Sequence, residues 1–221
     1  TPPDDSNPGR YAPQVKGDRA AIEAAVDIME RAERPILYTG GGVINSGTRA
    51  SALVRELVAE TDFPITSTLM GLGTYPASGK NWIGMLGMHG TYEANMAMHG
   101  CDAMICIGAR FDDRITGRLD AFSPDSEKVH IDIDPSSINK NVHVDVPIIG
   151  DVTHVLEEML AIWRERGSRR QQAALPGWWA QIQKWRDVKC LSYKNSDTLI
   201  KPQYALERLE ALTKGHDRYI T

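Results

Sequence analysis

Apolar residues recur along this chain in two alternating patterns, short continuous runs and longer segments with helical spacing. The first segment with helical spacing begins after Asp18, which can cap a helix, and ends before Pro35. The apolar run 36–38 follows and predicts a buried strand that ends at the three glycines of residues 40–42. The same criteria predict further strands at 63–68, 103–107, 128–133 and 147–149, and further helices around 53–58 and at 91–98, 152–166 and 201–212.

Strands that alternate with amphipathic helices form right-handed crossovers, which produce a parallel sheet covered by helices on both faces. We therefore predict a doubly wound, Rossmann-like α/β domain over residues 18–165, followed by C-terminal linker helices. The proline-rich residues 1–17 are predicted to form a linker. Residues 166–200 are predicted to form a basic linker and a helix that carries three of the five tryptophans.

The composition is that of an ordinary globular protein, with 42% hydrophobic residues, 24% charged residues and a net charge of −4. A slightly acidic chain without a lysine- or arginine-rich tract is a poor partner for nucleic acid or for an anionic membrane. Every apolar run is much shorter than the roughly 18 residues that a membrane span requires. Three cysteines without metal-ligand spacing predict a reducing compartment instead of a disulfide framework.

Candidate chemistry lies where the predicted strands end, because ligands of open parallel sheets bind at the carboxyl ends of the strands. The glycines of residues 40–42 follow the first strand and allow a diphosphate or a flat ring to approach the backbone closely. Three glycines are equally compatible with a strained turn that serves only the fold.

Three later strand ends carry charged residues. Residues 108–114 place two arginines and two aspartates directly after a strand, and arginine commonly binds phosphate through two hydrogen bonds. A surface cluster of ion pairs would have the same composition. Asp132 and Asp151 follow two other strands, where a carboxylate commonly accepts hydrogen bonds from ribose hydroxyls. Each aspartate alone also suits a helix cap or a turn, but together they indicate a nucleotide site.

Several familiar site patterns are missing from the sequence. The G-x-G-x-x-G fingerprint does not follow the first strand, and no glycine-rich loop carries the lysine and hydroxyl of a phosphate-binding NTPase. Histidine pairs with metal-ligand spacing and recognisable nucleophile signatures are absent too. His89, in the loop 85–90, suits either the lining of a flat aromatic ring or a histidine bonded to backbone. The residues alone therefore indicate a bound nucleotide-like cofactor without evident catalytic groups.

Five segments taken together carry a resemblance to a known family. They are YTGGG at 38–42, ITSTLMGLG at 65–73, MLGMHGT at 85–91, GARFDDR at 108–114 and HIDID at 130–134. In this order they resemble the central domain of the catalytic large subunit of the acetohydroxyacid synthase family, also called acetolactate synthases. The resemblance covers nearly the whole chain and is weakest at 165–195. It implies the middle third of a larger protein, in which residues 201–221 begin a C-terminal thiamine diphosphate domain.

The resemblance implies a protein that condenses pyruvate with a second 2-oxo acid, pyruvate or 2-oxobutyrate, at thiamine diphosphate with loss of carbon dioxide. These are early steps of branched-chain amino-acid synthesis. The central domain of this family binds FAD, which takes no part in the net redox chemistry. The FAD contacts that the resemblance implies here are Gly41, Gly42, Thr68, Leu69, Leu86, Gly87, Met88, His89, Gly108, Ala109, Arg110, Asp112, Asp132, Ile133, Asp151 and Val152.

Particular parts of FAD are implied for some of these residues. Gly41 and Gly42 would lie near the diphosphate, Thr68 and Leu69 near the isoalloxazine ring, Asp132 and Ile133 at the adenosine ribose, and Asp151 and Val152 near the adenine. Met88, Asp113 and Arg114 match positions that line the channel to the active site, where herbicidal inhibitors of this family bind.

The resemblance also implies what this segment lacks. The glutamate that activates the thiamine ring belongs to an N-terminal domain, and the Gly-Asp-Gly motif for magnesium and diphosphate belongs to a C-terminal one. Here Gly150 and Asp151 are followed by Val152, so that motif is absent. We therefore expect no catalytic residue and no metal ligand in this segment, and no synthase activity from the isolated chain.

The partners implied by the resemblance are a homodimer or homotetramer of large subunits and a small regulatory subunit, in the cytoplasm of a bacterium. Two alternatives remain at this point. One is another FAD-containing thiamine diphosphate enzyme, such as glyoxylate carboligase or pyruvate oxidase, against which Arg114 and the methionine–histidine loop 85–90 favour the synthase. The other is a free-standing nucleotide-binding module, which would lack a thiamine-binding domain on each side.

Overall fold

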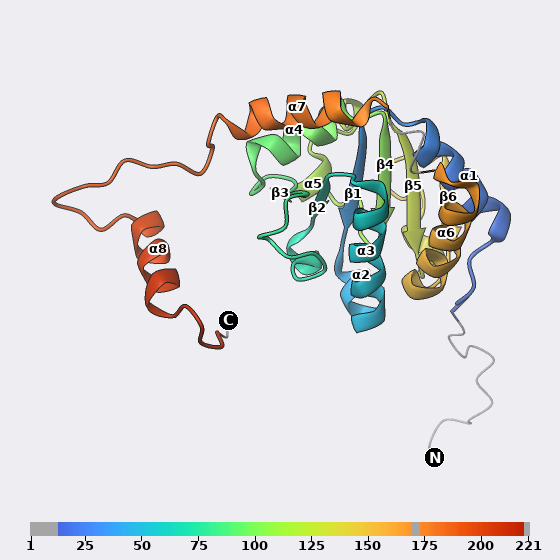
Figure 1. Cartoon of the computed structure of the whole chain (residues 1–221), viewed down its shortest axis with the longest axis horizontal. Helices are drawn as coiled ribbons and strands as arrows, with labels where there is room; N and C mark the ends of the chain where they lie inside the picture. The colour runs from blue at the N-terminus through green and yellow to red at the C-terminus, as the bar shows by residue number, and fades with distance from the viewer. Residues whose placement is uncertain (1–12, 169–172, 219–221) are drawn as a thin grey trace, which may run out of the picture. The chain divides into compact units, whose positions relative to one another are not determined.

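One parallel six-stranded sheet organises the chain (Figure 1), for which the structure, a computed structural model, describes residues 13–168 and 173–218. The strand order is β3-β2-β1-β4-β5-β6, so the order reverses between β1 and β4. The bounds are β1 Pro35–Thr39, β2 Ile65–Ser67, β3 Trp82–Met85, β4 Ala103–Ile107, β5 Glu127–Asp132 and β6 Val146–Ile149. The predicted doubly wound α/β fold is confirmed.

Eight α-helices are described, together with the short 3-10 helices η1 Leu69–Gly71, η2 Leu119–Ala121 and η3 Pro135–Ser137. The α-helices are α1 Arg19–Arg31, α2 Gly41–Asn45, α3 Thr48–Thr61, α4 Tyr92–Gly100, α5 Asp113–Thr116, α6 Val152–Arg166, α7 Leu175–Arg186 and α8 Pro202–Leu212. Helix α6 contacts both α1 and α3, so these three helices form one layer against the sheet. Asp18 and Asp151 cap α1 and α6, because each carboxylate accepts a hydrogen bond from a backbone N–H of the first turn.

The hydrophobic core lies on both faces of the central strands. Every residue of β1 and of β4 is buried, as expected for parallel strands covered by helices on both sides. Helix α7 extends this packing, because Leu175, Trp178 and Ile182 are buried. Figure 1 shows α7 running beside α4 at one end of the sheet, and the two helices are in contact.

Three segments differ from the sequence prediction. Strand β3 was not predicted, because it is a half-buried edge strand with a positive-φ glycine, Gly84, in its middle. We predicted only that the first strand ends at the glycines of residues 40–42, whereas Gly41 and Gly42 form the first turn of helix α2. The strand predicted at 63–68 is only three residues long, because Asp62 is left-handed at the end of α3 and Thr68 caps η1.

The chain divides into two compact units, Thr1–Val188 and Lys189–Thr221. The first unit contains the sheet and α7, and the second contains α8, which has no buried residue. Most of the predicted linker 1–17, the arginines at 169 and 170 and the last three residues lie outside the described residues. The predicted domain boundaries stay predictions.

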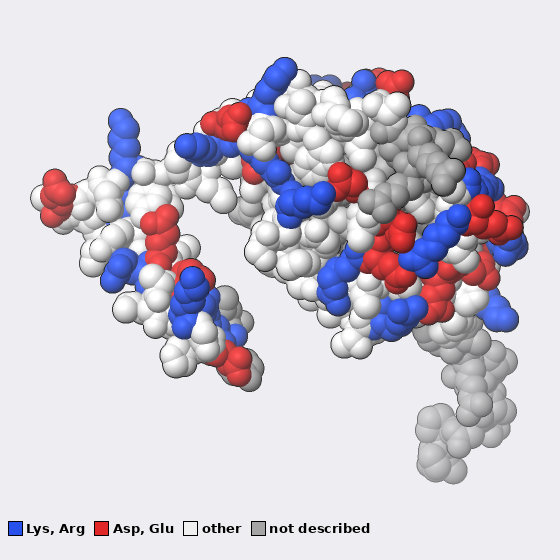
Figure 2. All heavy atoms as spheres, viewed as in Figure 1, with Lys and Arg blue, Asp and Glu red and all other residues white. Residues whose placement is uncertain are grey.

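Charged side chains of both signs are interspersed on the face drawn in Figure 2. Charged side chains also pair between helices of one layer: Arg164 of α6 binds Glu56 and Glu60 of α3, and Arg166 binds Asp27 and Glu30 of α1. Within the described residues, no helix is long and apolar enough to cross a membrane.

Candidate functional site

A cavity of about 770 Å³ lies at the carboxyl ends of the central strands, where the strand order reverses. Its walls contain most of the residues that we assigned to a ligand from the sequence. These are Gly41, Gly42, Thr68, Leu69, Gly108, Ala109, Arg110, Asp112, Asp113, Arg114, Asp132 and Ile133. Segments that are far apart in the sequence therefore meet at one hollow, as the switch-point rule for open parallel sheets predicts.

The floor of this cavity is a close crossing of two glycine-containing backbones. The Gly42 N–H donates to the Gly108 carbonyl oxygen (2.8 Å), and Gly108 has a φ of +58°. A Cβ atom built on Gly42 would lie 2.7 Å from the Cα of Gly108, so a side chain there would force the two segments apart. These glycines serve the fold and leave backbone exposed at the cavity.

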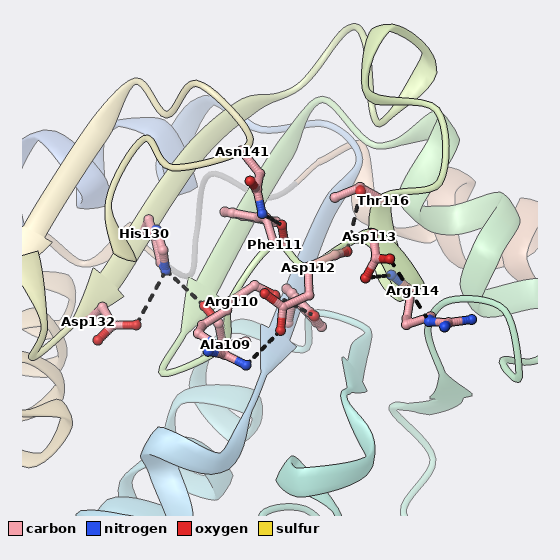
Figure 3. Close-up of polar contacts among 11 residues, drawn as sticks. Ala109, Arg110, Phe111, Asp112, Asp113, Arg114, Thr116, His130, Asp132 and Asn141 are labelled. Carbon is pink, nitrogen blue, oxygen red and sulfur yellow. Dashed lines mark hydrogen bonds and ion pairs between the residues drawn. The ribbon is translucent and has the colours of Figure 1, made fainter. Parts of the chain in front are cut away.

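Arg110 and Asp112 form an ion pair on the wall formed by the loop after β4. The Arg110 guanidinium donates to the Asp112 carboxylate over 2.8 Å, and both side chains are well exposed (Figure 3). Asp113 and Arg114 follow at the start of α5 and are more exposed still. An exposed arginine next to a cavity suits a phosphate oxygen, because it can exchange its carboxylate partner for the ligand.

Asp132 stands at the end of β5, on the opposite wall. One of its carboxylate oxygens accepts from the Asp134 N–H (2.9 Å), and the other lies 3.7 Å from His130 Nε2. Asp134 accepts from the Ser136 N–H and hydroxyl, and these hydrogen bonds hold the pKa of its carboxyl below the ordinary value. The wall therefore presents carboxylate oxygens, which are the kind of acceptor that ribose hydroxyls require.

Beneath the loop after β4 lie three buried polar side chains: Tyr38, Cys106 and His130. Burial raises the pKa of Tyr38 and of Cys106 and lowers the pKa of His130. All three are therefore neutral near pH 7. Their hydrogen bonds are with the backbone of the loop, and none of them lines the cavity.

The predicted residues 86–89 do not line the cavity but adjoin it. The Met88 N–H donates to the Arg114 carbonyl oxygen (3.1 Å), so this loop lies directly beside α5. Met88 is 64% exposed, His89 is exposed and Leu86 is buried. Gly87 has a positive φ and lies close to the backbone of Arg114. The three residues predicted to line a channel, Met88, Asp113 and Arg114, are thus neighbours.

The structure places Asp151 and Val152 outside the cavity as well. Asp151 caps α6 and accepts from the Ser46 hydroxyl (3.0 Å), and Val152 is buried. The cavity walls also contain residues that we did not assign from the sequence: Asn45, Met70, Ile115, Asp134 and Ser137. Met70 and Asp134 lie inside the motifs already singled out, so each motif in full was a better guide than its selected positions.

The fold and this site define a class of domain that a family comparison also identifies. The family model "Thiamine pyrophosphate enzyme, central domain" matches residues 22–159. Because the match covers more than half of the 221 residues, the chain belongs to this family of central domains.

Among the similar proteins with names are acetolactate synthases, of which we give three. The chain is 43% identical over 211 residues to acetolactate synthase isozyme 3 large subunit of Escherichia coli, with 96% of this chain and 36% of that protein aligned. It is 44% identical over 205 residues to the acetolactate synthase large subunit of Haemophilus influenzae, covering 93% and 35%. It is 42% identical over 220 residues to the acetolactate synthase of Mycobacterium leprae, covering 99% and 35%. The chain therefore spans about a third of the length of these relatives.

Proposed function

We propose that this chain is the FAD-binding central domain of an acetolactate synthase large subunit. The observation that carries the proposal is the cavity at the carboxyl ends of the strands, whose walls contain ten of the sixteen predicted FAD contacts, from four separate segments. The three relatives named above, all called acetolactate synthases, support this choice over glyoxylate carboligase, pyruvate oxidase or a free-standing nucleotide-binding module.

The residues of the cavity fit a flavin dinucleotide. The exposed backbone of Gly41, Gly42 and Gly108 and the guanidinium of Arg110 suit the diphosphate, and the Asp132 carboxylate suits the ribose hydroxyls. Thr68 and Leu69 supply a partly apolar wall for the isoalloxazine ring, and residues 86–89 adjoin the same side. In this proposal FAD takes no part in net redox chemistry, and Met88, Asp113 and Arg114 lie on the approach to the active site.

The complete protein, in this proposal, condenses pyruvate with pyruvate or 2-oxobutyrate and releases carbon dioxide. The described residues contain no group of three or more His, Cys, Asp or Glu side chains that could hold a metal ion. In this proposal, magnesium and thiamine diphosphate, which supplies the carbanion chemistry, bind to other domains of that protein. We further propose large subunits assembled as a homodimer or homotetramer, a small regulatory subunit and a bacterial cytoplasmic location.

Two preparations test the proposal: the full-length protein that contains this chain and the isolated 221 residues. We expect the full-length protein to retain FAD and to form acetolactate from pyruvate with thiamine diphosphate and magnesium. The isolated chain should form none, because its sequence has neither the activating glutamate segment nor the Gly-Asp-Gly motif. Acetolactate formation by the isolated chain, or a full-length protein that binds no FAD, would contradict the proposal.

A further inference from the structure

The three buried polar residues beneath the loop after β4 form a row across the sheet. Tyr38 of β1 is in register with Cys106 of β4, and Cys106 is in register with His130 of β5. Side chains at the same register of adjacent strands lie on the same face, so the three form a transverse line. All three side chains lie beneath the loop 109–112.

Every member of the row binds a carbonyl of that loop. The Cys106 thiol (3.1 Å) and His130 Nε2 (2.8 Å) both bind the Ala109 carbonyl oxygen, and the Tyr38 hydroxyl donates to the Arg110 carbonyl oxygen (3.3 Å). The Asn141 side-chain amide donates to the next carbonyl, that of Phe111 (2.8 Å), as Figure 3 shows. Three successive carbonyls are therefore held by side chains from other segments.

These hydrogen bonds orient the loop. In a trans peptide the N–H points opposite to the carbonyl oxygen, and this chain has no cis peptide in the described residues. When the Ala109 and Arg110 carbonyls face the row, the N–H groups of Arg110 and Phe111 face away from it. The Phe111 ring packs on Tyr38 and His130, with ring centroids 6.1 Å and 5.1 Å away, which leaves Arg110 and Asp112 on the outside of the turn.

The row itself is not reactive. Its members are buried, and the second ring nitrogen of His130, Nδ1, has no hydrogen-bond partner among the described residues. His130 therefore acts through Nε2, which donates to the Ala109 carbonyl as an N–H. The hydrogen bonds of the row therefore reach the ligand site through the backbone of the loop, and His130 also lies 3.7 Å from the Asp132 carboxylate.

We infer that Tyr38, Cys106 and His130 are positioning residues of the ligand site, which hold Arg110 and its N–H toward a phosphate group before the ligand binds. The inference rests on the proposed function, because it takes the phosphate to belong to FAD. Without the row, the loop must be ordered at the moment of binding, and that cost lowers the apparent affinity. A residue that only stabilises the fold would not change the affinity of molecules that remain folded.

The test uses the full-length protein stripped of FAD and then titrated with FAD, followed by flavin fluorescence. Tyr38→Phe removes one hydroxyl and keeps the ring that packs on Phe111, and Tyr75→Phe removes a hydroxyl at the other end of the sheet as the matched control. One hydrogen bond of ordinary strength corresponds to a rise of about 2- to 12-fold in the FAD dissociation constant. We expect that rise for Tyr38→Phe and no change for Tyr75→Phe.

A pair of substitutions at His130 adds a rescue test. His130→Gln keeps an N–H at a similar reach, and His130→Leu removes it, so the affinity should fall in the leucine variant and recover in the glutamine variant. Urea unfolding of each FAD-free variant measures the accompanying change in stability. An unchanged FAD dissociation constant in Tyr38→Phe, or equal losses in both His130 variants, would overturn the inference. A wild-type protein that binds no FAD would overturn the proposed function, and this inference with it.

Discussion

The two ends of the sheet use their polar and aromatic residues differently. At the amino ends of the strands, the indole N–H groups of Trp178 and Trp179 donate to the carbonyls of Pro35 and Asp62, over 3.0 Å and 2.9 Å. Charged groups there also bind within the protein: Lys80 pairs with Asp62, and Arg186 donates to the Trp82 carbonyl. At the carboxyl ends, the charged residues of the loop after β4 stand in solvent beside glycine backbone.

Cavity size does not separate the two ends. The amino end carries a hollow of about 900 Å³ that Arg55, Asp62, Trp179 and Arg186 help to line, and it is larger than the cavity of about 770 Å³ at the carboxyl end. The difference is that Arg55 and Arg186 already donate to backbone carbonyls of this chain. The arginines at the carboxyl end, Arg110 and Arg114, instead pair with exposed neighbouring carboxylates, which a charged ligand can replace.

The largest effect on stability is expected at the amino end. Trp178→Ala removes a buried indole that also packs edge-on against Trp185, with centroids 5.6 Å apart. We expect a loss of about 3–5 kcal/mol in the free energy of unfolding, measured by urea denaturation followed by circular dichroism. FAD affinity of the folded protein should stay unchanged, and a clear loss of affinity would show that the two ends are coupled.

Arg110→Ala is expected to have the opposite profile. The substitution removes an exposed donor, so stability should hardly change, whereas FAD binding should weaken by about 1.5–3 kcal/mol, the contribution of a hydrogen bond to a charged group. Arg118→Ala is a matched control, because Arg118 forms the same kind of ion pair with Asp120 (2.8 Å) away from the cavity. Equal flavin content in the two variants after gel filtration would contradict the assignment of Arg110.

Gly42→Ala should affect both stability and binding. The added methyl would meet the Gly108 backbone at 2.7 Å, and such overpacking costs about 1–3 kcal/mol. The displaced backbone forms the cavity floor, so FAD affinity should fall as well. Gly177→Ala, in α7 with nothing within 4 Å of the added atom, should instead stabilise the helix by up to about 1 kcal/mol. Unfolding curves and FAD titrations of both variants provide the comparison.

The smallest effect concerns pH. Burial lowers the pKa of His130 below the ordinary value of 6.5, so the unfolded chain takes up a proton before the folded one does. The corresponding stability is fully present above pH 6.5 and is lost as the pH falls through the folded-state pKa. His130→Gln should therefore show a shallower loss of unfolding free energy below pH 6.5 than the wild-type chain. If the unfolding free energies of the two proteins changed with pH in parallel, His130 would not contribute to this pH dependence.

Much of the fold was predictable because its central strands are buried on both faces. The runs 36–38 and 103–107 lie within β1 and β4, and capping by Asp18 and Asp151 occurs where the sequence predicted helices to begin. The sequence did not predict strand β3, because Gly84 interrupts a half-buried edge strand. It did not predict helix α2, because glycine is a poor helix former. The hydrophobic pattern therefore predicts an element well only where several consecutive residues share the same degree of burial.

By itself, the sequence determined the fold class and the segments in which most of the cavity-lining residues lie, because apolar periodicity and strand-end chemistry are local properties. Only the tertiary structure decided which of those residues share a wall of one cavity, and that residues 86–89 adjoin it while Asp151 caps a helix. It alone revealed the row of Tyr38, Cys106 and His130. The physical reason is register: these residues are 68 and 24 positions apart, and only the pairing of β1, β4 and β5 brings them under one loop.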